Sequence, residues 1–314
     1  MAGSTGVVIA ALIANAAIGI LKFVAFLLTG SPAMLSETYH SISDTGNQVF
    51  LLIGIRYGSR DADRRHPFGY GKAQFFFAFL VAVMLFGIAG WASASHGYEK
   101  LMHPSTHGGG DPVTLFGTTF EPVMVSYAVL AGAFLFEGYA LMKARAEMKR
   151  QMAEHGWGSY REAFRKTSDV TTLTALTEDT IALTGIFLAF AGILATQMTG
   201  NPVYDAASAF LIGIMLMGFA VALGWENKRL IMGESVPRAE EARLKQVVRD
   251  QTGVDDIVDF RTVYFGPEQL VVTADVAFEA GIKTATMDDY ITDIEDALRT
   301  AEPSIEKVYI EPEY

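Results

Sequence analysis

Cysteine is absent from the 314 residues of this chain. Disulfide bonds and thiolate metal sites are therefore excluded, and the redox compartment cannot be inferred from cysteine usage. Positive charge is also scarce, since 24 Lys and Arg residues stand against 35 Asp and Glu residues and the net charge is −11. The HExxH pattern of metal-dependent hydrolases is missing as well. The chain is therefore not expected to be an enzyme.

The charged and apolar residues are distributed unevenly. Residues 233–314 carry 8 basic and 19 acidic residues, whereas residues 1–232 carry 16 of each. Hydrophobic residues make up 51% of the chain, the mean hydropathy is +0.27, and nearly all of the apolar excess lies before residue 230. This division predicts two domains, 1–232 in the membrane and 233–314 in water. The acidic domain repels nucleic acid and anionic lipid, so no nucleic-acid partner is expected.

Several segments are long and apolar enough for the roughly 20 residues that a bilayer-spanning helix needs. They are residues 5–29, 32–57, 73–98, 121–146, 170–198 and 203–227. No basic residue precedes the first segment, which is typical of a spanning helix rather than of a cleaved signal peptide. We therefore expect an α-helical integral membrane protein with six transmembrane helices, surrounded by membrane lipid.

Lys and Arg lie mostly on one side of the predicted membrane. Of the 16 in residues 1–232, 14 fall in the connection between the second and third helices, in that between the fourth and fifth, in the helix ends next to these connections, or after the sixth helix. They are Arg56, Arg60, Arg64, Arg65, Lys72, Lys143, Arg145, Lys149, Arg150, Arg161, Arg165, Lys166, Lys228 and Arg229. Connections rich in Lys and Arg face the cytoplasm. This predicts that the N- and C-termini are both cytoplasmic.

Residues 233–314 contain both helical and strand-like patterns. Helical spacing covers 237–252 and 287–300, and strand-like runs cover 257–265, 269–278 and 307–310. The order αββαβ predicts a compact α+β sheet with both helices on one face.

The predicted spanning helices carry acidic residues and a histidine, each of which costs about 2.5–3.5 kcal/mol near the bilayer centre when charged. The second helix contains Glu37, His40 and Asp44, and the fifth contains Glu178 and Asp179. His40 and Asp44 are four residues apart, so they share one helix face and offer half of a tetrahedral metal site. Alternatively, His40 and Asp44 are a hydrogen-bonded pair that fixes helix packing, and Glu178 and Asp179 lie in the headgroup region.

Other polar residues of the helices have structural explanations too. Glu137 of the fourth helix either hydrogen-bonds between helices or carries protons. Asp205 lies three residues after Pro202 and is expected to cap a helix N-terminus. Lys22 of the first helix either snorkels to the interface or pairs with a carboxylate.

Sequence motifs follow one another along the chain in a characteristic order. They are SPAMLSETYHSISDTGNQ, HPFGYGKAQFF, SASHGYEKLMHP, EDTIALTG, NPVYDAASAFLIG and GES. In this order and spacing they resemble the cation diffusion facilitator family, and in particular a branch with Glu-Asp in the fifth transmembrane helix. The resemblance covers essentially the whole chain. It implies a homodimeric, proton-coupled exporter of divalent metal ions with six transmembrane helices and a ferredoxin-like cytoplasmic domain.

The resemblance also implies a transport site with two residues from the second helix and two from the fifth, each pair four residues apart. His40 and Asp44 match the first pair, and Asp179 matches the second member of the other pair. The partner position holds Ala175, which has no group that binds a metal. Glu178 is the expected substitute.

Two amides extend this predicted site. Asn47 and Gln48 lie one turn beyond Asp44, so their side-chain oxygens can complete the set of ligands. We assign Asn47 to the metal and give Gln48, with Glu137, a proton-carrying or packing role. The histidine-rich loop that is frequent in the family is missing, and residues 233–314 contain no histidine. Metal sensing by the C-terminal domain is therefore not expected.

The ligand set predicts which ions are carried. One imidazole with two or three carboxylates suits zinc, and also Mn²⁺, Fe²⁺ or Co²⁺, while the lack of thiolates disfavours Cu⁺. Zinc is favoured as the substrate, and no prosthetic group is expected. Protons compete with a metal for the same atoms, which predicts proton-coupled antiport. The alternative function is a non-transporting membrane scaffold or regulatory member of the family with a degenerate site, because Ala175 removes one ligand.

Overall fold

The computed structural model describes residues 2–104, 113–115, 118–160, 163, 170–267 and 269–313. Three of the basic residues used to predict the orientation lie outside the described residues: Arg161, Arg165 and Lys166. Contacts within the chain group it into two compact units. One contains residues 1–49 and 81–222, and the other contains residues 50–80 and 223–314.

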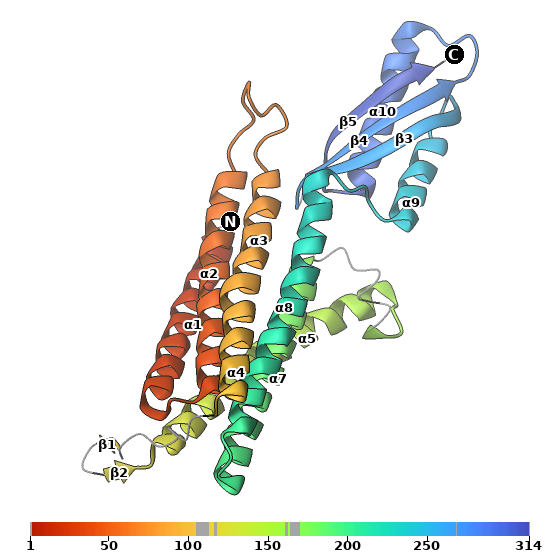
Figure 1. Ribbon diagram of the computed structural model, residues 1–314. Coiled ribbons are helices and arrows are strands. Elements are labelled where there is room, and N and C mark those ends of the chain that lie inside the picture. Colours follow the sequence, from red (N-terminus) through yellow and green to blue (C-terminus); the bar gives the residue numbers. More distant parts are fainter. Residues whose placement is uncertain are drawn as a thin grey trace. The chain divides into compact units, whose positions relative to one another are not determined.

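All six predicted membrane segments are helical (Figure 1). The helices are α1 (Ala2–Thr29), α2 (Pro32–Gly58), α3 (Lys72–Met84), the π-helix η1 (Leu85–Trp91), α4 (Ala92–Met102), α5 (Pro122–His155), α7 (Val170–Thr199) and α8 (Val203–Met232). The third predicted segment is thus built from α3, η1 and α4, with a π-helix at its centre. A short hairpin of β1 (Val113–Leu115) and β2 (Thr118–Phe120) precedes α5.

Among the described residues, five stretches are long and apolar enough to cross a membrane. They are Leu12–Thr29, Lys72–Met102, Pro122–Ala153, Ala175–Thr199 and Val203–Met232. Helix α2 has the length, with 27 residues, but it is more polar. Its polar side chains are buried in the bundle, with Glu37 0%, Thr38 1% and His40 2% exposed. Burial against other helices removes these groups from lipid, which explains how so polar a helix fits in the membrane domain.

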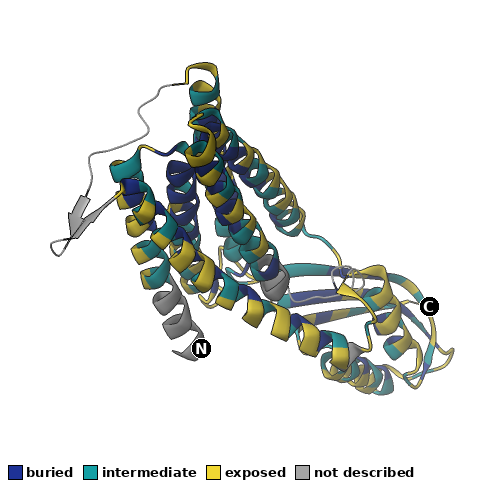
Figure 2. Cartoon of the chain, turned by 90° about the horizontal axis from the view of Figure 1, so that it is seen from below, coloured by how far each residue is buried: buried dark blue, intermediate teal, exposed yellow. Residues whose placement is uncertain are grey.

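The outer faces of the helices are apolar. Ile13, Leu135 and Phe187 are each more than 60% exposed, and Figure 2 shows exposed residues along the outside of the helices with buried residues between them. Such surfaces are typical of helices that face lipid, where exposed apolar side chains carry no penalty.

Small residues allow close contact between α8 and the third membrane segment. A Cβ atom on Gly213 would lie 2.3 Å from the backbone nitrogen of Ala94, and one on Gly97 would lie 2.4 Å from that of Phe210. Because real Cβ atoms do not approach other atoms so closely, glycine at these positions lets the two helix backbones touch. This is a common way to pack membrane helices.

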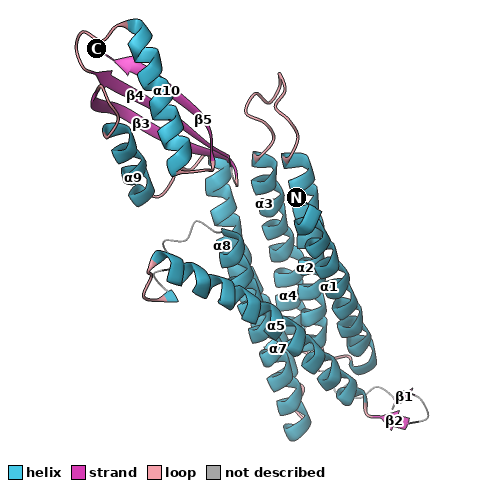
Figure 3. Ribbon diagram, turned by 180° about the vertical axis from the view of Figure 1, so that it is seen from behind, coloured by secondary structure: helices cyan, strands magenta, loops and turns pink. Residues whose placement is uncertain are grey.

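The C-terminal domain follows the predicted αββαβ order, with α9 (Arg238–Arg249), β3 (Val254–Gly266), β4 (Gln269–Phe278), α10 (Thr284–Ala301) and β5 (Ile305–Glu313). Strand β4 is central, antiparallel to β3 and parallel to β5. Both helices cover one face of the sheet (Figure 3), as predicted. Leu244 and Val248 of α9 pack with Ile294 and Leu298 of α10 against Leu270 of β4 in a fully buried core.

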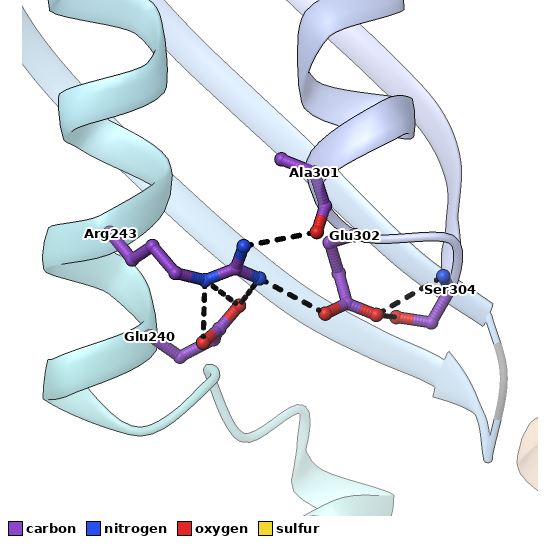
Figure 4. A network of polar contacts seen from close by, with 5 residues as sticks. All are labelled: Glu240, Arg243, Ala301, Glu302 and Ser304. Carbon is purple, nitrogen blue, oxygen red and sulfur yellow. Dashed lines mark hydrogen bonds and ion pairs between the residues drawn. The ribbon is translucent and has the colours of Figure 1, made fainter. Parts of the chain in front are cut away.

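A polar network joins α9 to the turn between α10 and β5 (Figure 4). Arg243 pairs with Glu240 on its own helix and donates to the carbonyl of Ala301 at 3.0 Å and to Glu302 at 3.3 Å. Glu302 in turn accepts a hydrogen bond from the hydroxyl of Ser304 at 2.7 Å. These groups are partly exposed, so each pair contributes little to stability, but together they orient the turn.

The loop between α2 and α3 is ordered by one carboxylate. Asp63 accepts hydrogen bonds from the backbone nitrogens of Arg65 at 2.8 Å and His66 at 2.7 Å, and from the hydroxyl of Tyr70 at 2.7 Å. The hydrogen bond from Tyr70 holds the pKa of Asp63 below its usual value. In the same unit, the ring of Phe68 lies 4.6 Å from that of Phe265, so this loop packs on the turn between β3 and β4.

Candidate metal site in the helix bundle

His40 and Asp44 lie one turn apart on α2 and both are buried. The Nε2 atom of His40 is 3.6 Å from Oδ2 of Asp44, and the two residues are 2% and 8% exposed. This distance is too long for a good hydrogen bond. Neither ring nitrogen of His40 has a hydrogen-bond partner within the described part of the chain. Buried polar atoms normally have partners, so the free imidazole fits a side chain that binds something from outside the protein.

Glu178 of α7 meets α2 at the level of Asp44 and Asn47. The side-chain nitrogen of Asn47 is 3.3 Å from one oxygen of Glu178 and 3.5 Å from the other. The carboxyl groups of Asp44 and Glu178 also interact electrostatically with each other. The structure therefore brings together three of the predicted ligands, which come from two helices.

Along α7, Ala175 precedes Glu178 by three residues and Asp179 follows it directly. Asp179 is half-buried, and the carboxylates that act on it electrostatically are Glu137 and Glu178. Ala175 is half-buried and offers no donor atom. The contact from α7 to this part of α2 is thus made by Glu178, the residue expected to substitute for the missing ligand.

Glu137 and Gln48 are the two residues with a predicted proton-carrying or packing role beside these ligands. Glu137 on α5 is 9% exposed and interacts electrostatically with Asp44, Glu178 and Asp179. The side-chain oxygen of Gln48 is buried and has no partner among the residues that the structure describes. Within those residues, no three His, Asp or Glu side chains converge as a metal-binding group. The site is therefore an open set of side chains rather than a closed cage.

Lys22 forms a buried ion pair with Glu37. Its ammonium nitrogen lies 2.8 Å from Oε2 of Glu37, and both side chains are almost fully buried. This confirms the second of the two possibilities predicted for Lys22, pairing with a carboxylate. The sequence did not point to Glu37 as its partner. The spacing of three residues from Glu37 to His40 is the signal that could have drawn attention to it.

Asp205 caps a helix, but not the one on which it lies. Its Oδ1 atom accepts a hydrogen bond from the backbone nitrogen of Ala33 at 3.1 Å, in the first turn of α2. Ser31 caps the same end, because its hydroxyl accepts from the backbone nitrogen of Met34 at 3.2 Å. Asp205 therefore does cap a helix N-terminus, but the helix is α2 rather than the one that follows Pro202, on which the prediction was based. This cap fixes the end of the helix that carries His40 and Asp44.

Comparison with known proteins places these helices in a family. Residues 8–232 match the model of the cation efflux transmembrane domain. The human mitochondrial proton-coupled zinc antiporter SLC30A9 is 29% identical over 282 residues, which are 90% of this chain and 47% of that protein. Metal tolerance protein C4 of Arabidopsis thaliana is 28% identical over 260 residues, which are 82% of this chain and 53% of that protein. The chain thus spans about half the length of these curated relatives.

Other relatives are matched over more of their length. The magnetosome protein MamM of Paramagnetospirillum magneticum is 23% identical over 81% of this chain and 71% of its own. Among solved structures, the C-terminal domain of MamM in a nickel form has a TM-score of 0.24 and 14% identity, covering 24% of this chain and 96% of that one. The transmembrane match covers well over half of the chain, and the site residues described above fall inside it. The chain belongs to the cation efflux family, the cation diffusion facilitators.

Proposed function

We propose that this protein exports a divalent transition-metal ion from the cytoplasm in exchange for protons, and that the ion binds between α2 and α7. The observation that carries the proposal is the hydrogen bond from Asn47 to Glu178 across these two helices, beside the buried carboxyl group of Asp44. His40 adds a buried imidazole without a hydrogen-bond partner in the described residues. We propose His40, Asp44, Asn47, Glu178 and Asp179 as the ligands.

The donor set favours zinc as the substrate. One imidazole nitrogen and several carboxylate oxygens are acceptable to Zn²⁺, Mn²⁺, Fe²⁺ and Co²⁺. The name of the human relative, a proton-coupled zinc antiporter, supports zinc and proton coupling for this chain. The ion is cargo, so the site must release it as well as bind it. An open site with few fixed ligands meets that requirement better than a closed one.

Proton coupling is supported by the pair Asp44 and Glu178. Two buried carboxylates repel each other, so a shared proton that neutralises one of them stabilises the pair. A divalent ion that binds between them needs both in the deprotonated form, so it displaces that proton. Proton return then expels the ion. Glu137, which interacts electrostatically with both carboxylates, is proposed to pass protons to or from them, and Gln48 to pack beside Asp44.

The remaining features of the proposal concern the whole protein. We propose a homodimer embedded in membrane lipid, with the N- and C-termini cytoplasmic, a membrane domain of residues 1–232 and a ferredoxin-like domain of residues 233–314. The concentration of Lys and Arg in connections on one side supports this orientation. Ala175 favours the second candidate function, a non-transporting scaffold or regulatory member of the family. Transport is preferred because Glu178 supplies a carboxylate from α7 beside Asn47, although Ala175 offers no ligand.

Zinc flux into proteoliposomes tests the proposal. Asp44→Ala and Asp179→Ala should each abolish flux driven by a proton gradient, because each removes one of the proposed carboxylate ligands, while the protein remains folded. Asp296→Ala is the matched control, since its carboxylate lies in α10 and is 73% exposed. Flux in the unsubstituted protein excludes the scaffold function, whereas near-normal flux in either site variant would rule out the proposed site.

A further inference from the structure

Glu37 has one carboxylate oxygen that nothing in the described chain binds. The residue is 0% exposed, and Lys22 contacts only its Oε2 atom, at 2.8 Å. The other oxygen, Oε1, is buried without a hydrogen-bond partner among the described residues. A buried carboxylate that serves only to pair with Lys22 should have both oxygens satisfied, because an unpaired one costs free energy. The free oxygen therefore indicates a ligand.

Gly185 of α7 leaves room for that oxygen. A Cβ atom at this position would lie 2.7 Å from Oε1 of Glu37, which is closer than real Cβ atoms approach. Glycine here therefore lets the carboxylate rest directly against the backbone of α7. Gly185 lies about two turns along α7 from Glu178, so Glu37 and Glu178 occupy different levels of the same contact between α2 and α7.

His40 lies on α2 between these two levels. It follows Glu37 by three residues and precedes Asp44 by four, so all three lie on neighbouring parts of one helix face. A Glu-x-x-His pair on one helix is an arrangement that binds divalent ions in other helical proteins. The charges of Glu37 and Lys22 both act on His40, and both ring nitrogens of His40 are without partners in the described part of the chain.

We propose that Glu37 and His40 form a second position for the divalent ion, one turn from Asp44 toward the N-terminal end of α2, and that Lys22 is the counter-ion of Glu37 when this position is empty. The proposal rests on the proposed function, because His40 is a ligand in both positions. The ion passes from Asp44 and Glu178 to Glu37 without leaving His40. In the proposed orientation the N-terminal end of α2 faces outward, so this is the exit step.

Lys22 makes the second position a weak one. An ion that binds Glu37 must share its carboxylate with a fixed ammonium group or displace it, and two positive charges a few ångströms apart repel each other strongly in a buried site. The same ammonium group neutralises Glu37 once the ion has left, so no unpaired charge remains in the membrane. A transport pathway needs positions that bind an ion well enough to accept it and weakly enough to release it.

Isothermal titration calorimetry of the full-length protein in detergent, with Zn²⁺ alone as the titrant, tests this position. In an Asp44→Ala background, which disables the first position, one weak zinc-binding event per chain should remain. Adding Lys22→Met should tighten it by about tenfold or more, because a competing charge is removed. Adding Lys22→Met together with Glu37→Gln should abolish it. This double replacement leaves no unpaired buried charge, so the variant is expected to fold.

A steric variant keeps every charge and gives an independent answer. Gly185→Ala in the same background should weaken the remaining event, since the added methyl group displaces Oε1 of Glu37. Gly132→Ala is the matched control, because a Cβ atom there meets nothing within 4 Å. The second position is overturned if the residual binding is unchanged by both the Lys22→Met/Glu37→Gln pair and Gly185→Ala. The proposed function fails separately, if Asp44→Ala transports zinc normally.

Discussion

At the scale of single residues, Glu178 is the side chain of α7 that contacts α2 at the proposed site. It adjoins Asp179 on α7, and the two side chains are about 100° apart around the helix. Only one of them can face α2 squarely. Glu178 makes the contact to Asn47 and interacts electrostatically with Asp44, while Asp179 interacts electrostatically with Glu137 and Glu178. We propose that a glutamate one position before Asp179 compensates for the alanine at position 175.

Glu178→Gln should weaken zinc binding by about tenfold or more and reduce the number of protons released when zinc binds. The substitution removes one titrating ligand and keeps the shape of the side chain. Calorimetry in buffers of different ionisation enthalpy measures both quantities. Asn47→Ala is the comparison, because an amide does not titrate. It should change metal preference more than proton release. Unchanged affinity and unchanged proton release in Glu178→Gln would contradict the assignment.

Ala175→His should shift the preference of the site toward zinc. The substitution restores a donor four residues before Asp179, and imidazole favours zinc over manganese. The ratio of zinc to manganese affinities, measured by competition in the same detergent, should rise relative to the unsubstituted protein. If the ratio stays the same, position 175 does not face the bound ion, and the ligands lie elsewhere on α7.

At the scale of elements, close helix contact supports the bundle around the site. The third membrane segment contains a π-helix, η1, whose Gly90 also lies against α8, since a Cβ atom on Gly90 would be 2.5 Å from the side chain of Met217. Together with the contacts of Gly97 and Gly213, this forms one continuous line of close contact. Asp205 adds a link from α8 to the first turn of α2. The helix that carries His40 and Asp44 is therefore held at its end as well as along its length.

Gly213→Ala should lower the stability of the membrane domain by about 1–3 kcal/mol, the usual cost of overpacking. Its Cβ atom would meet the backbone nitrogen of Ala94 at 2.3 Å, and a backbone atom cannot move aside as a flexible side chain can. Gly218→Ala on the same helix is the control, because its Cβ atom meets nothing within 4 Å. It should leave stability unchanged or raise it slightly, since alanine favours helix. Thermal unfolding in detergent compares the two, and equal melting temperatures would contradict the close contact.

At the scale of the whole molecule, the C-terminal domain has a hydrophobic core of its own. Its buried residues come from both helices and all three strands, including Leu244, Leu270, Ile294 and Ile305. Residues 233–314 contain neither histidine nor cysteine, and acidic side chains alone favour hard cations over zinc. A contribution of this domain to a homodimer would therefore depend on apolar contacts rather than on transition metal.

Expressed alone, residues 234–314 should fold and associate to the same extent with and without a chelator. Analytical ultracentrifugation at several concentrations measures the association constant in each condition. Addition of Zn²⁺ after the chelator is removed serves as the control. Dimerisation that depends on added metal would show that carboxylates of this domain form a metal site between subunits.

The helices and strands were predictable because they depend on local patterns. Runs of about 20 apolar residues must be helical in a membrane, and alternation of apolar side chains marks the strands of a half-buried sheet. The predicted strand 269–278 coincides with β4, whereas β3 and β5 extend beyond their predicted ends. The π-helix was not predicted, because a single extra residue in a helical turn leaves the apolar composition unchanged.

The sequence by itself determined the two kinds of domain, the order of their elements and the spacing of His40, Asp44 and Asn47 along one helix. Spacing relates residues on the same helix only. Three features depend on how each helix is rotated against its neighbours. They are the face of α7 that meets α2, the carboxylate that pairs with Lys22, and the helix that Asp205 caps. That rotation is set by side-chain packing and by close contacts such as those at Gly185 and Gly213. Only the tertiary structure therefore decided that Glu178 contacts Asn47 and that Glu37 keeps one oxygen without a partner among the described residues.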